Sequence, residues 1–427
     1  MAAHGFVALF LVSLLAVPRA STTMAALACL LALAAGFRGW RSDARAGFAH
    51  MAVFVIPAVI YLLHVLVQMI VGMAPTNLSS HLLIGALTLS VGLSSVPQRL
   101  SDVRRWLLPA AAIGAIGTCL VALYQVRVLG YLRPYGWLGG GPIGNGAIKF
   151  GDLAALQALL AFVLVLTADR KSHRLLGLAG LCCGVVALAL TQTRGGILGF
   201  LVAVATLGLA LGLRHKCAGP DAIASPASAL RAKARRGTTV ALVALALVLT
   251  LSAAGFMQNR FAEIEPQIQR YLKGDANSEV GQRLALWQAA IRAGLNAPLT
   301  GAGFGGFGEE LDRQIAAGAI PESERIRYSQ PHNEYLGALA AAGVTGFLSL
   351  LLMFLAPVFA LVRQIVVGGG SPAAYAALVT AAAFAGFALT DAMFDRQITV
   401  ITFFLLNAWF LRAAWVPGSR ARLKGVG

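Results

Sequence analysis

The stretch that decides the fold is Ser329-Gln-Pro-His-Asn-Glu-Tyr335, which leads directly into an apolar run from Leu336 to Val367. This run is longer than the roughly 20 apolar residues that cross a bilayer as a helix. The polar heptapeptide therefore stands at the mouth of a membrane helix, beside water and lipid headgroups. It carries a histidine, and an ionisable group at the edge of a membrane helix is typical of a functional site.

The rest of the chain repeats this apolar pattern. Of its 427 residues, 58% are hydrophobic and only 12% are charged, which predicts an all-α, polytopic membrane protein. We expect about 12 transmembrane helices, at residues 5–17, 21–37, 48–73, 78–96, 106–129, 150–168, 173–190, 195–213, 238–257, 336–367, 373–392 and 398–415.

The first of these segments resembles a secretory signal, but its leading region carries no Lys or Arg, and Val17-Pro-Arg-Ala20 is a poor cleavage site. We interpret it as a retained first helix. The five cysteines all fall within or beside hydrophobic segments, so neither a disulfide framework nor a zinc site is indicated. They are Cys29, Cys119, Cys182, Cys183 and Cys217.

The net charge of +17 reports topology rather than nucleic-acid binding, because the basic residues are distributed between the helices. They concentrate in the loops after the second, fourth, sixth and eighth helices and in the C-terminal tail. By the positive-inside rule both termini are expected in the cytoplasm, and the basic segment 214–237 is expected to be a flexible cytoplasmic linker. The long loop then faces the periplasm of a Gram-negative cell.

We expect one integrated membrane domain in three parts. Residues 1–257 hold helices 1 to 9, residues 258–335 form the periplasmic loop region, and residues 336–427 hold helices 10 to 12 and a short cytoplasmic tail. The loop carries ten of the 17 acidic residues together with basic ones, so it should be folded and contain amphipathic helices. One such helix is predicted over Ser278 to Ala293, where an apolar stripe lies at helical spacing. The stripe is Val280, Leu284, Trp287 and Ile291.

Pro298 ends this pattern, and the run Gly301-Ala-Gly-Phe-Gly-Gly-Phe-Gly308 follows it. The spacing matches G-x-G-x-x-G, but no predicted strand precedes it, so we reject a dinucleotide site. The preferred interpretation is a tight turn that lets backbone pack near the membrane surface. The alternative is a turn whose backbone N–H groups approach a phosphate or sugar.

The predicted topology brings the unusual polar residues to one face of the membrane. They are Lys149, Asp152, Arg194, Arg283, His332, Asp391 and Arg396. Arg194 begins a helix in the run Thr191-Gln-Thr-Arg-Gly-Gly196, where unpaired N–H groups and the helix dipole favour an anion. Its planar guanidinium binds phosphate bidentately, which suits a pyrophosphate. The alternative is an interfacial arginine that reaches to lipid headgroups.

The remaining candidates also have ordinary interpretations. Arg283 can be a solvated charge on its amphipathic helix, and His332 can be a structural histidine hydrogen-bonded at a helix start. A neutral histidine at that position could instead accept a proton from a sugar hydroxyl. His64, in the middle of the third helix, lacks polar company and is expected to be a packed core residue.

At these residues the sequence resembles the bacterial O-antigen ligase and polymerase superfamily. The run Pro331-His-Asn-Glu-Tyr-Leu336, followed by Ala-Ala-Gly-Val-Thr-Gly346, is similar to its hallmark, and Thr191 to Gly196 is similar to its arginine motif. Gly281-Gln-Arg-Leu-Ala-Leu-Trp287 and Pro298 to Gly305 resemble the loop helix and glycine turn of the same family. The motifs cover residues 191 to 350, and the His-Asn motif is the most specific of them.

The resemblance implies a membrane-embedded, GT-C-like glycosyltransferase that inverts the transferred sugar without a metal ion or other cofactor. Its donor would be a glycan on undecaprenyl pyrophosphate and its acceptor lipid A-core, at the periplasmic face of the inner membrane. By the same resemblance, His332 would be the base, and Arg194 and Arg283 would bind the pyrophosphate. We expect three residues to support these roles: Lys149 and Asp152, as a pair that orders the donor site, and Asn333.

The sequence leaves alternatives open. An O-antigen polymerase is built on similar helices, and we favour the ligase because the motif spacing looks closer to it. The short tail after the last helix argues against the protein-glycosylating relatives. A lipid or sugar transporter is a third possibility, but transporters place their ionisable groups near the bilayer centre between repeated halves, and no repeat is evident here.

Overall fold

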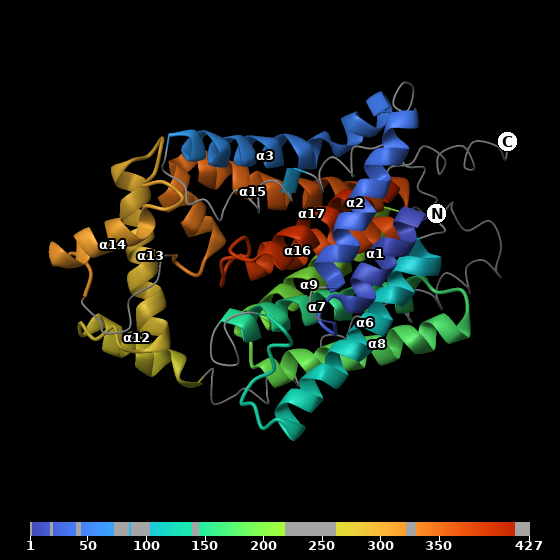
Figure 1. Ribbon diagram of the computed structural model, residues 1–427, viewed down its shortest axis with the longest axis horizontal. Helices are drawn as coiled ribbons and strands as arrows, with labels where there is room; N and C mark the ends of the chain where they lie inside the picture. The colour runs from blue at the N-terminus through green and yellow to red at the C-terminus, as the bar shows by residue number, and fades with distance from the viewer. Residues whose placement is uncertain are drawn as a thin grey trace.

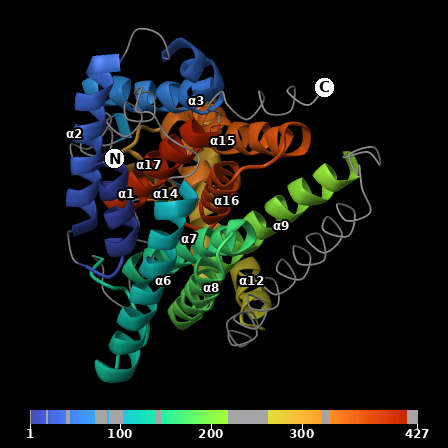
Figure 2. The same cartoon turned by 90° about the vertical axis from the view of Figure 1, so that its right-hand side faces the viewer.

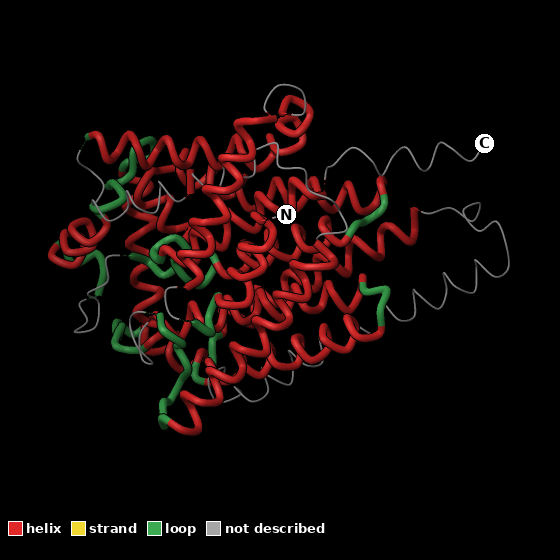
Figure 3. The backbone as a smooth tube through the Cα atoms, turned by 45° about the vertical axis from the view of Figure 1, so that its right-hand side comes forward, coloured by secondary structure: helices red, strands yellow, loops and turns green. Residues whose placement is uncertain are grey.

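The computed structural model describes residues 2–17, 20–39, 44–71, 85–86, 103–138, 145–217, 262–321 and 330–414. Every regular element in these ranges is a helix, and Figure 3 shows the described backbone as helices joined by loops and turns. The all-α class predicted from the sequence is therefore confirmed for this part of the chain.

Seven helical spans within the described residues are long and apolar enough to cross a membrane. They lie in α3 (Ala44–Ile70), in the continuous run of η1 (Val103–Leu107), α6 (Leu108–Leu123) and η2 (Tyr124–Val128), and in α7 (Asn145–Thr167), α8 (Lys171–Thr191), α9 (Arg194–Cys217), α15 (Glu334–Gly368) and α17 (Gln397–Ala414).

Three further helices have shorter apolar stretches: α1 (Ala2–Ser13), α2 (Ala20–Gly39), whose apolar part is Thr22–Leu31, and α16 (Pro372–Phe387). The predicted span 238–257 and nearly all of 78–96 lie outside the described residues, as does most of the linker 214–237. The structure thus describes a multi-pass arrangement, and the total of twelve spans stays a prediction.

Two of the spanning helices form the interior of the bundle. In both α7 and α17, 89% of the apolar stretch is buried within the protein, compared with 33% in α15 and 44% in α8. α7 packs against α6, α8, α9 and α16, and Figure 2 shows it in the middle of this group. The first turn of α7, which carries Lys149 and Asp152, is consequently fixed by neighbours on several sides.

Small residues allow this close packing, as is common between membrane helices. A Cβ atom added at Gly184 of α8 would lie 2.7 Å from the Cβ of Ala158 in α7. One added at Gly386 of α16 would lie 2.6 Å from the Cα of Gly199 in α9. Neither contact leaves room for a side chain, so these helices approach at the distance that glycine permits.

A second group of helices caps one end of the bundle, with α13 lying crosswise to α3 and α15 (Figure 1). The group consists of α12 (Ile264–Leu272), α13 (Glu279–Asn296) and α14 (Phe307–Ala316). The predicted helix in the long loop is confirmed as α13, which begins where Ser278 accepts a hydrogen bond from the Gly281 N–H at 3.0 Å.

The buried face of α13 differs from the predicted one. The large apolar side chains of the predicted stripe are half-buried or, in the case of Ile291, exposed. The buried face runs through Gly281, Gln282, Ala285, Leu286, Ala289, Ala290, Ala293 and Gly294. Small residues dominate it because α13 packs closely on α15: a Cβ at Gly294 would lie 2.5 Å from the Leu339 side chain.

The glycine turn after α13 docks onto a break in α15. At Ala342 and Gly343 the backbone leaves the helical conformation, and Gly343 has φ of +64°, which glycine tolerates best. The turn supplies hydrogen-bond partners there: Ala302 N–H donates to Ala340 O at 2.7 Å, and Gly303 N–H donates to Ala341 O at 3.0 Å. The predicted tight, backbone-packing turn is confirmed, and these two N–H groups are already used by the protein.

The expectation for His64 was wrong. Its ring is partly exposed, with Nε2 lying 2.9 Å from Thr345 Oγ1 and Nδ1 lying 3.3 Å from Ile60 O. The neighbouring Gln68 donates to Ala341 O at 2.8 Å. His64 therefore belongs to a polar contact between α3 and the broken part of α15, which spacing along one helix could not reveal.

Candidate functional site

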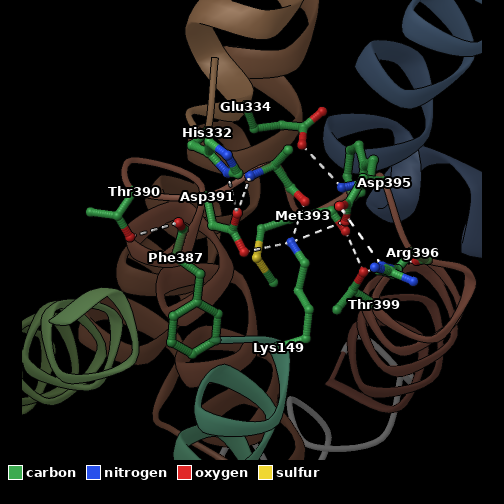
Figure 4. Close-up of polar contacts among 12 residues, drawn as sticks. Lys149, His332, Glu334, Phe387, Thr390, Asp391, Met393, Asp395, Arg396 and Thr399 are labelled. Atoms are coloured by element: carbon green, nitrogen blue, oxygen red, sulfur yellow. Dashed lines mark hydrogen bonds and ion pairs between the residues drawn. The ribbon is translucent and has the colours of Figure 1, made fainter. Parts of the chain in front are cut away.

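The ionisable side chains gather where three elements meet. These are the first turn of α7, the residues just before α15, and the loop 388–396 between α16 and α17 (Figure 4). Asp391 and Asp395 lie in that loop, which the sequence shows only as a short polar break between two apolar segments. The predicted topology places these residues on one face of the membrane. In the structure, side chains from all three elements contact one another.

Lys149 is at the centre of the cluster and is fully buried. Its ammonium lies 2.7 Å from Asp391 Oδ2 and 3.1 Å from Asp395 Oδ1, and it also donates to the carbonyl of Ala392. Among the described residues Lys149 forms no ion pair with Asp152, because its ammonium contacts two carboxylates and one carbonyl of the loop instead. Its role is to tie α7 to the loop.

Asp391 is the other buried partner in this network. Burial alone would raise the pKa of Asp391, but the charge of Lys149 and hydrogen bonds from His332 and Lys149 outweigh it and lower the pKa to about 2. Its Oδ1 also accepts the N–H of Ala392 at 2.9 Å. Asp391 is therefore a carboxylate at neutral pH.

His332 faces this carboxylate. Its Nδ1 lies 3.4 Å from Asp391 Oδ1, and the residue is 6% exposed. An ionised carboxylate can only accept, so Nδ1 carries the hydrogen and Nε2 of the neutral ring is left as a proton acceptor. His332 also has φ of +49°, one of two positive values among the described residues other than glycine. Such a conformation is held by its surroundings and is frequent at functional sites.

The residues after His332 are anchored firmly. Asn333 caps α15 by accepting the N–H of Leu336 at 3.1 Å, and its amide donates to Leu389 O at 3.0 Å. Glu334 donates its backbone N–H to Ala388 O at 2.9 Å and accepts the Phe394 N–H at 3.0 Å. The supporting role expected of Asn333 thus has a physical basis, since it joins the start of α15 to the end of α16.

Arg283 reaches the same loop from α13. Its Nη1 donates to the carbonyl of Thr390 at 2.7 Å, directly before Asp391 (Figure 4 shows both loop residues). Arg283 is half-buried, and this hydrogen bond holds its guanidinium at the loop. The interpretation of Arg283 as a merely solvated charge is wrong.

Arg194 begins α9, as the sequence predicts. The following Gly195 and Gly196 are buried, and an added Cβ at Gly195 would collide with the hydroxyl of Thr390. The first turn of α9 therefore lies against the same residue that Arg283 contacts. The dipeptide Thr390-Asp391 thus contacts the start of α9, Arg283, His332 and Lys149.

Asp152 occupies a different position from the expected one. It is fully buried, and an added Cβ at Gly196 would lie 3.2 Å from its Oδ1. Neither carboxyl oxygen has a hydrogen-bond partner among the described residues. Asp152 thus lies beside the first turn of α9 and, among the described residues, forms no ion pair with Lys149.

The structure brings two further groups to the site: Arg133, which the sequence did not single out, and Trp287, which it predicted only as part of the apolar stripe of the loop helix. Arg133 donates from Nε to Thr191 O at 2.5 Å and from Nη2 to Thr193 Oγ1 at 3.4 Å, which fixes the turn before Arg194. Trp287 donates its indole N–H to Pro331 O at 3.0 Å. No motif marks Arg133, and the helical spacing of Trp287 indicates apolar packing rather than a hydrogen bond.

The fold and this cluster define the class: a multi-pass, all-helical membrane protein with a buried lysine, carboxylate and histidine network where its polar loops meet the bundle. Residues 178–351 match the family model described as O-antigen ligase. The match contains the arginine motif, α13, the glycine turn and His332, so the resemblance to the O-antigen ligase superfamily is confirmed.

A second comparison covers a wider part of the chain. An uncharacterized protein of Haemophilus influenzae is 26% identical over 266 residues, which is 61% of this chain and 61% of that protein. The chain thus matches about three fifths of the relative's length. This likeness carries no substrate or activity with it.

Proposed function

We propose that the protein is an O-antigen ligase, which transfers polysaccharide from undecaprenyl pyrophosphate to lipid A-core at the periplasmic face of the inner membrane. The observation that carries the proposal is the set of contacts around Thr390-Asp391. They join a histidine oriented by a carboxylate to Arg283 of α13 and to the first turn of α9, which Arg194 begins. This arrangement has the parts that an attack by a sugar hydroxyl on a pyrophosphate-linked sugar requires.

In the proposed reaction, the acceptor hydroxyl oxygen attacks the anomeric carbon of the donor from the side opposite the pyrophosphate. The bond between that carbon and the pyrophosphate oxygen breaks, and its electron pair leaves with the pyrophosphate. His332 takes the hydroxyl proton on Nε2, while Asp391 stabilises the imidazolium that results. Attack from the opposite side inverts the anomeric configuration.

Arg194 and Arg283 are proposed to bind the pyrophosphate and to stabilise the charge that develops as it leaves. Arginine suits this role because its planar guanidinium donates two parallel hydrogen bonds to phosphate. Arg194 adds the N-terminal end of α9, which favours an anion. A pyrophosphate is already a weak base, so charge stabilisation matters more than protonation, and we propose that no metal ion is needed.

Deletion of the gene tests the proposal against its alternatives. Loss of a ligase leaves bare lipid A-core while full-length polymer accumulates on undecaprenyl pyrophosphate. Core that carries a single repeat unit would identify a polymerase instead, and donor retained on the cytoplasmic side would identify a transporter.

Complementation of the deleted strain tests the base. We expect His332→Ala to lower transfer by at least about 100-fold at normal protein levels, as loss of a general base does. His64→Ala is the matched control, because His64 is a half-exposed histidine that contacts Thr345 and not Asp391. Transfer at the wild-type rate by His332→Ala would remove this residue as the base. Activity that survives extraction with EDTA would support a reaction without a metal ion.

A further inference from the structure

Helix α13 holds both members of the His332 and Asp391 pair. Arg283 and Trp287 are four residues apart on this helix and therefore share one face. Arg283 donates to the carbonyl before Asp391, and Trp287 donates to the carbonyl before His332. One turn of a helix in the polar loop thus contacts each of the two segments that carry the pair.

The contact of Trp287 acts on the backbone conformation of His332. The carbonyl of Pro331 lies in the same peptide plane as the N–H of His332, so a bond that fixes this carbonyl also fixes rotation about φ of His332. That φ is +49°, a left-handed value that is unfavourable for a residue other than glycine. The surroundings must stabilise this conformation.

The anchors around His332 are unevenly distributed. On the C-terminal side, Asn333 and Glu334 are hydrogen-bonded to the end of α16 through Leu389 O and Ala388 O. Toward the N-terminus, within the described residues, Gln330 contacts Asp395 at 3.2 Å and Trp287 contacts Pro331 at 3.0 Å. Only the second of these acts on the peptide that precedes the histidine.

We propose that Trp287 is a positioning residue whose indole N–H holds the peptide before His332, and thereby keeps the imidazole on Asp391. Without this bond the peptide relaxes toward a negative φ, and the ring turns away from the carboxylate. The inference rests on the proposed function for its kinetic consequence, but the contact itself can be tested without any transfer reaction.

The test compares Trp287→Phe, which keeps an aromatic ring and removes the donor, with the matched change Trp137→Phe. Trp137 also donates its indole N–H to a backbone carbonyl, that of Ala16 at 3.4 Å, but it is exposed and its acceptor lies just after α1 and not beside His332. Purified proteins in detergent are first compared by thermal unfolding, which shows whether each variant is folded.

The first measurement is carbethoxylation of His332 by diethylpyrocarbonate, with His332→Ala subtracted to isolate this residue among the seven histidines. We expect the modification rate of His332 to change by at least about threefold in Trp287→Phe and to stay unchanged in Trp137→Phe. An unchanged rate in a folded Trp287→Phe protein would overturn the inference, whatever the activity of the wild type.

The second measurement is transfer from a purified lipid-linked donor. Trp287→Phe should lower kcat by about 10- to 100-fold, the size expected from a small misplacement of a reacting group, with KM for both substrates little changed. A rise in KM with unchanged kcat would contradict positioning of the base. A wild-type protein without transfer activity, together with the expected change in carbethoxylation, would reject the proposed function and leave the contact established.

Discussion

His332 Nδ1 lies 3.4 Å from Asp391 Oδ1, although the two residues are 59 positions apart in the chain and belong to segments separated by α15 and α16. The carboxylate is itself fixed by Lys149, 2.7 Å from its other oxygen. With its hydrogen on Nδ1, a neutral imidazole can accept a proton only on Nε2. The predictions below follow from this relationship and from the packing that maintains it.

Asp391→Asn should reduce kcat by about 10²- to 10⁴-fold, because an amide neither stabilises the imidazolium nor imposes the tautomer that leaves Nε2 unprotonated. The comparison is Asp395→Asn, which changes the other carboxylate partner of Lys149 without touching His332. Steady-state kinetics with purified donor distinguishes them. Equal losses in both variants would show that the two aspartates act only through Lys149.

Lys149→Met should destabilise the protein by about 3–5 kcal/mol, because it leaves the buried carboxylate of Asp391 without its cation. Thermal unfolding in detergent measures this. Arg104→Met is the control: Arg104 lies 2.5 Å from Asp169, but the side chains are 38% and 69% exposed, so the loss should stay below about 1 kcal/mol. Similar shifts in the two variants would contradict a buried network around Lys149.

Arg194→Lys should impair transfer nearly as strongly as Arg194→Ala, since lysine keeps the charge but not the planar fork that binds phosphate bidentately. Inorganic pyrophosphate should inhibit the wild type. Weaker inhibition of both variants would locate the defect in anion binding. Full activity of the lysine variant would show that only the charge at the start of α9 matters.

The low pKa of Asp391 predicts how stability depends on pH. Because the pKa falls from 3.8 to about 2 on folding, the carboxylate contributes on the order of 2 kcal/mol above pH 4, and this contribution is lost as the pH falls from 4 through 2. The midpoint temperature of thermal unfolding should therefore fall more steeply between pH 5 and pH 2 for the wild type than for Asp391→Asn. Parallel curves would show that Asp391 is not the responsible group.

Gly386→Ala should lower stability by about 1–3 kcal/mol, because the new methyl group would lie 2.6 Å from the Cα of Gly199 and would force α9 and α16 apart. Gly212→Ala, in the same helix α9, meets nothing within 4 Å and should be neutral or slightly stabilising. Unfolding midpoints that move equally would contradict the close approach of these helices.

Several features followed from the sequence because they depend on local pattern alone. Apolar runs predicted the membrane helices, and the start of α9 at Arg194 and of α15 just after His332 agrees with the sequence to within a residue or two. The helix in the loop was predicted from its spacing, and its buried face was not. Spacing identifies large apolar residues, whereas close packing on α15 selected the small ones.

By itself, the sequence determined the helical membrane class and the residues that lie at helix ends, because hydrophobic length and chain order are sufficient for both. The tertiary structure decided the partners. Lys149 binds Asp391 and Asp395 and not Asp152, His64 contacts Thr345, and Trp287 contacts the peptide before His332. Such choices depend on how helices distant in the chain pack against one another, and buried charges take the partner that this packing brings within hydrogen-bonding distance.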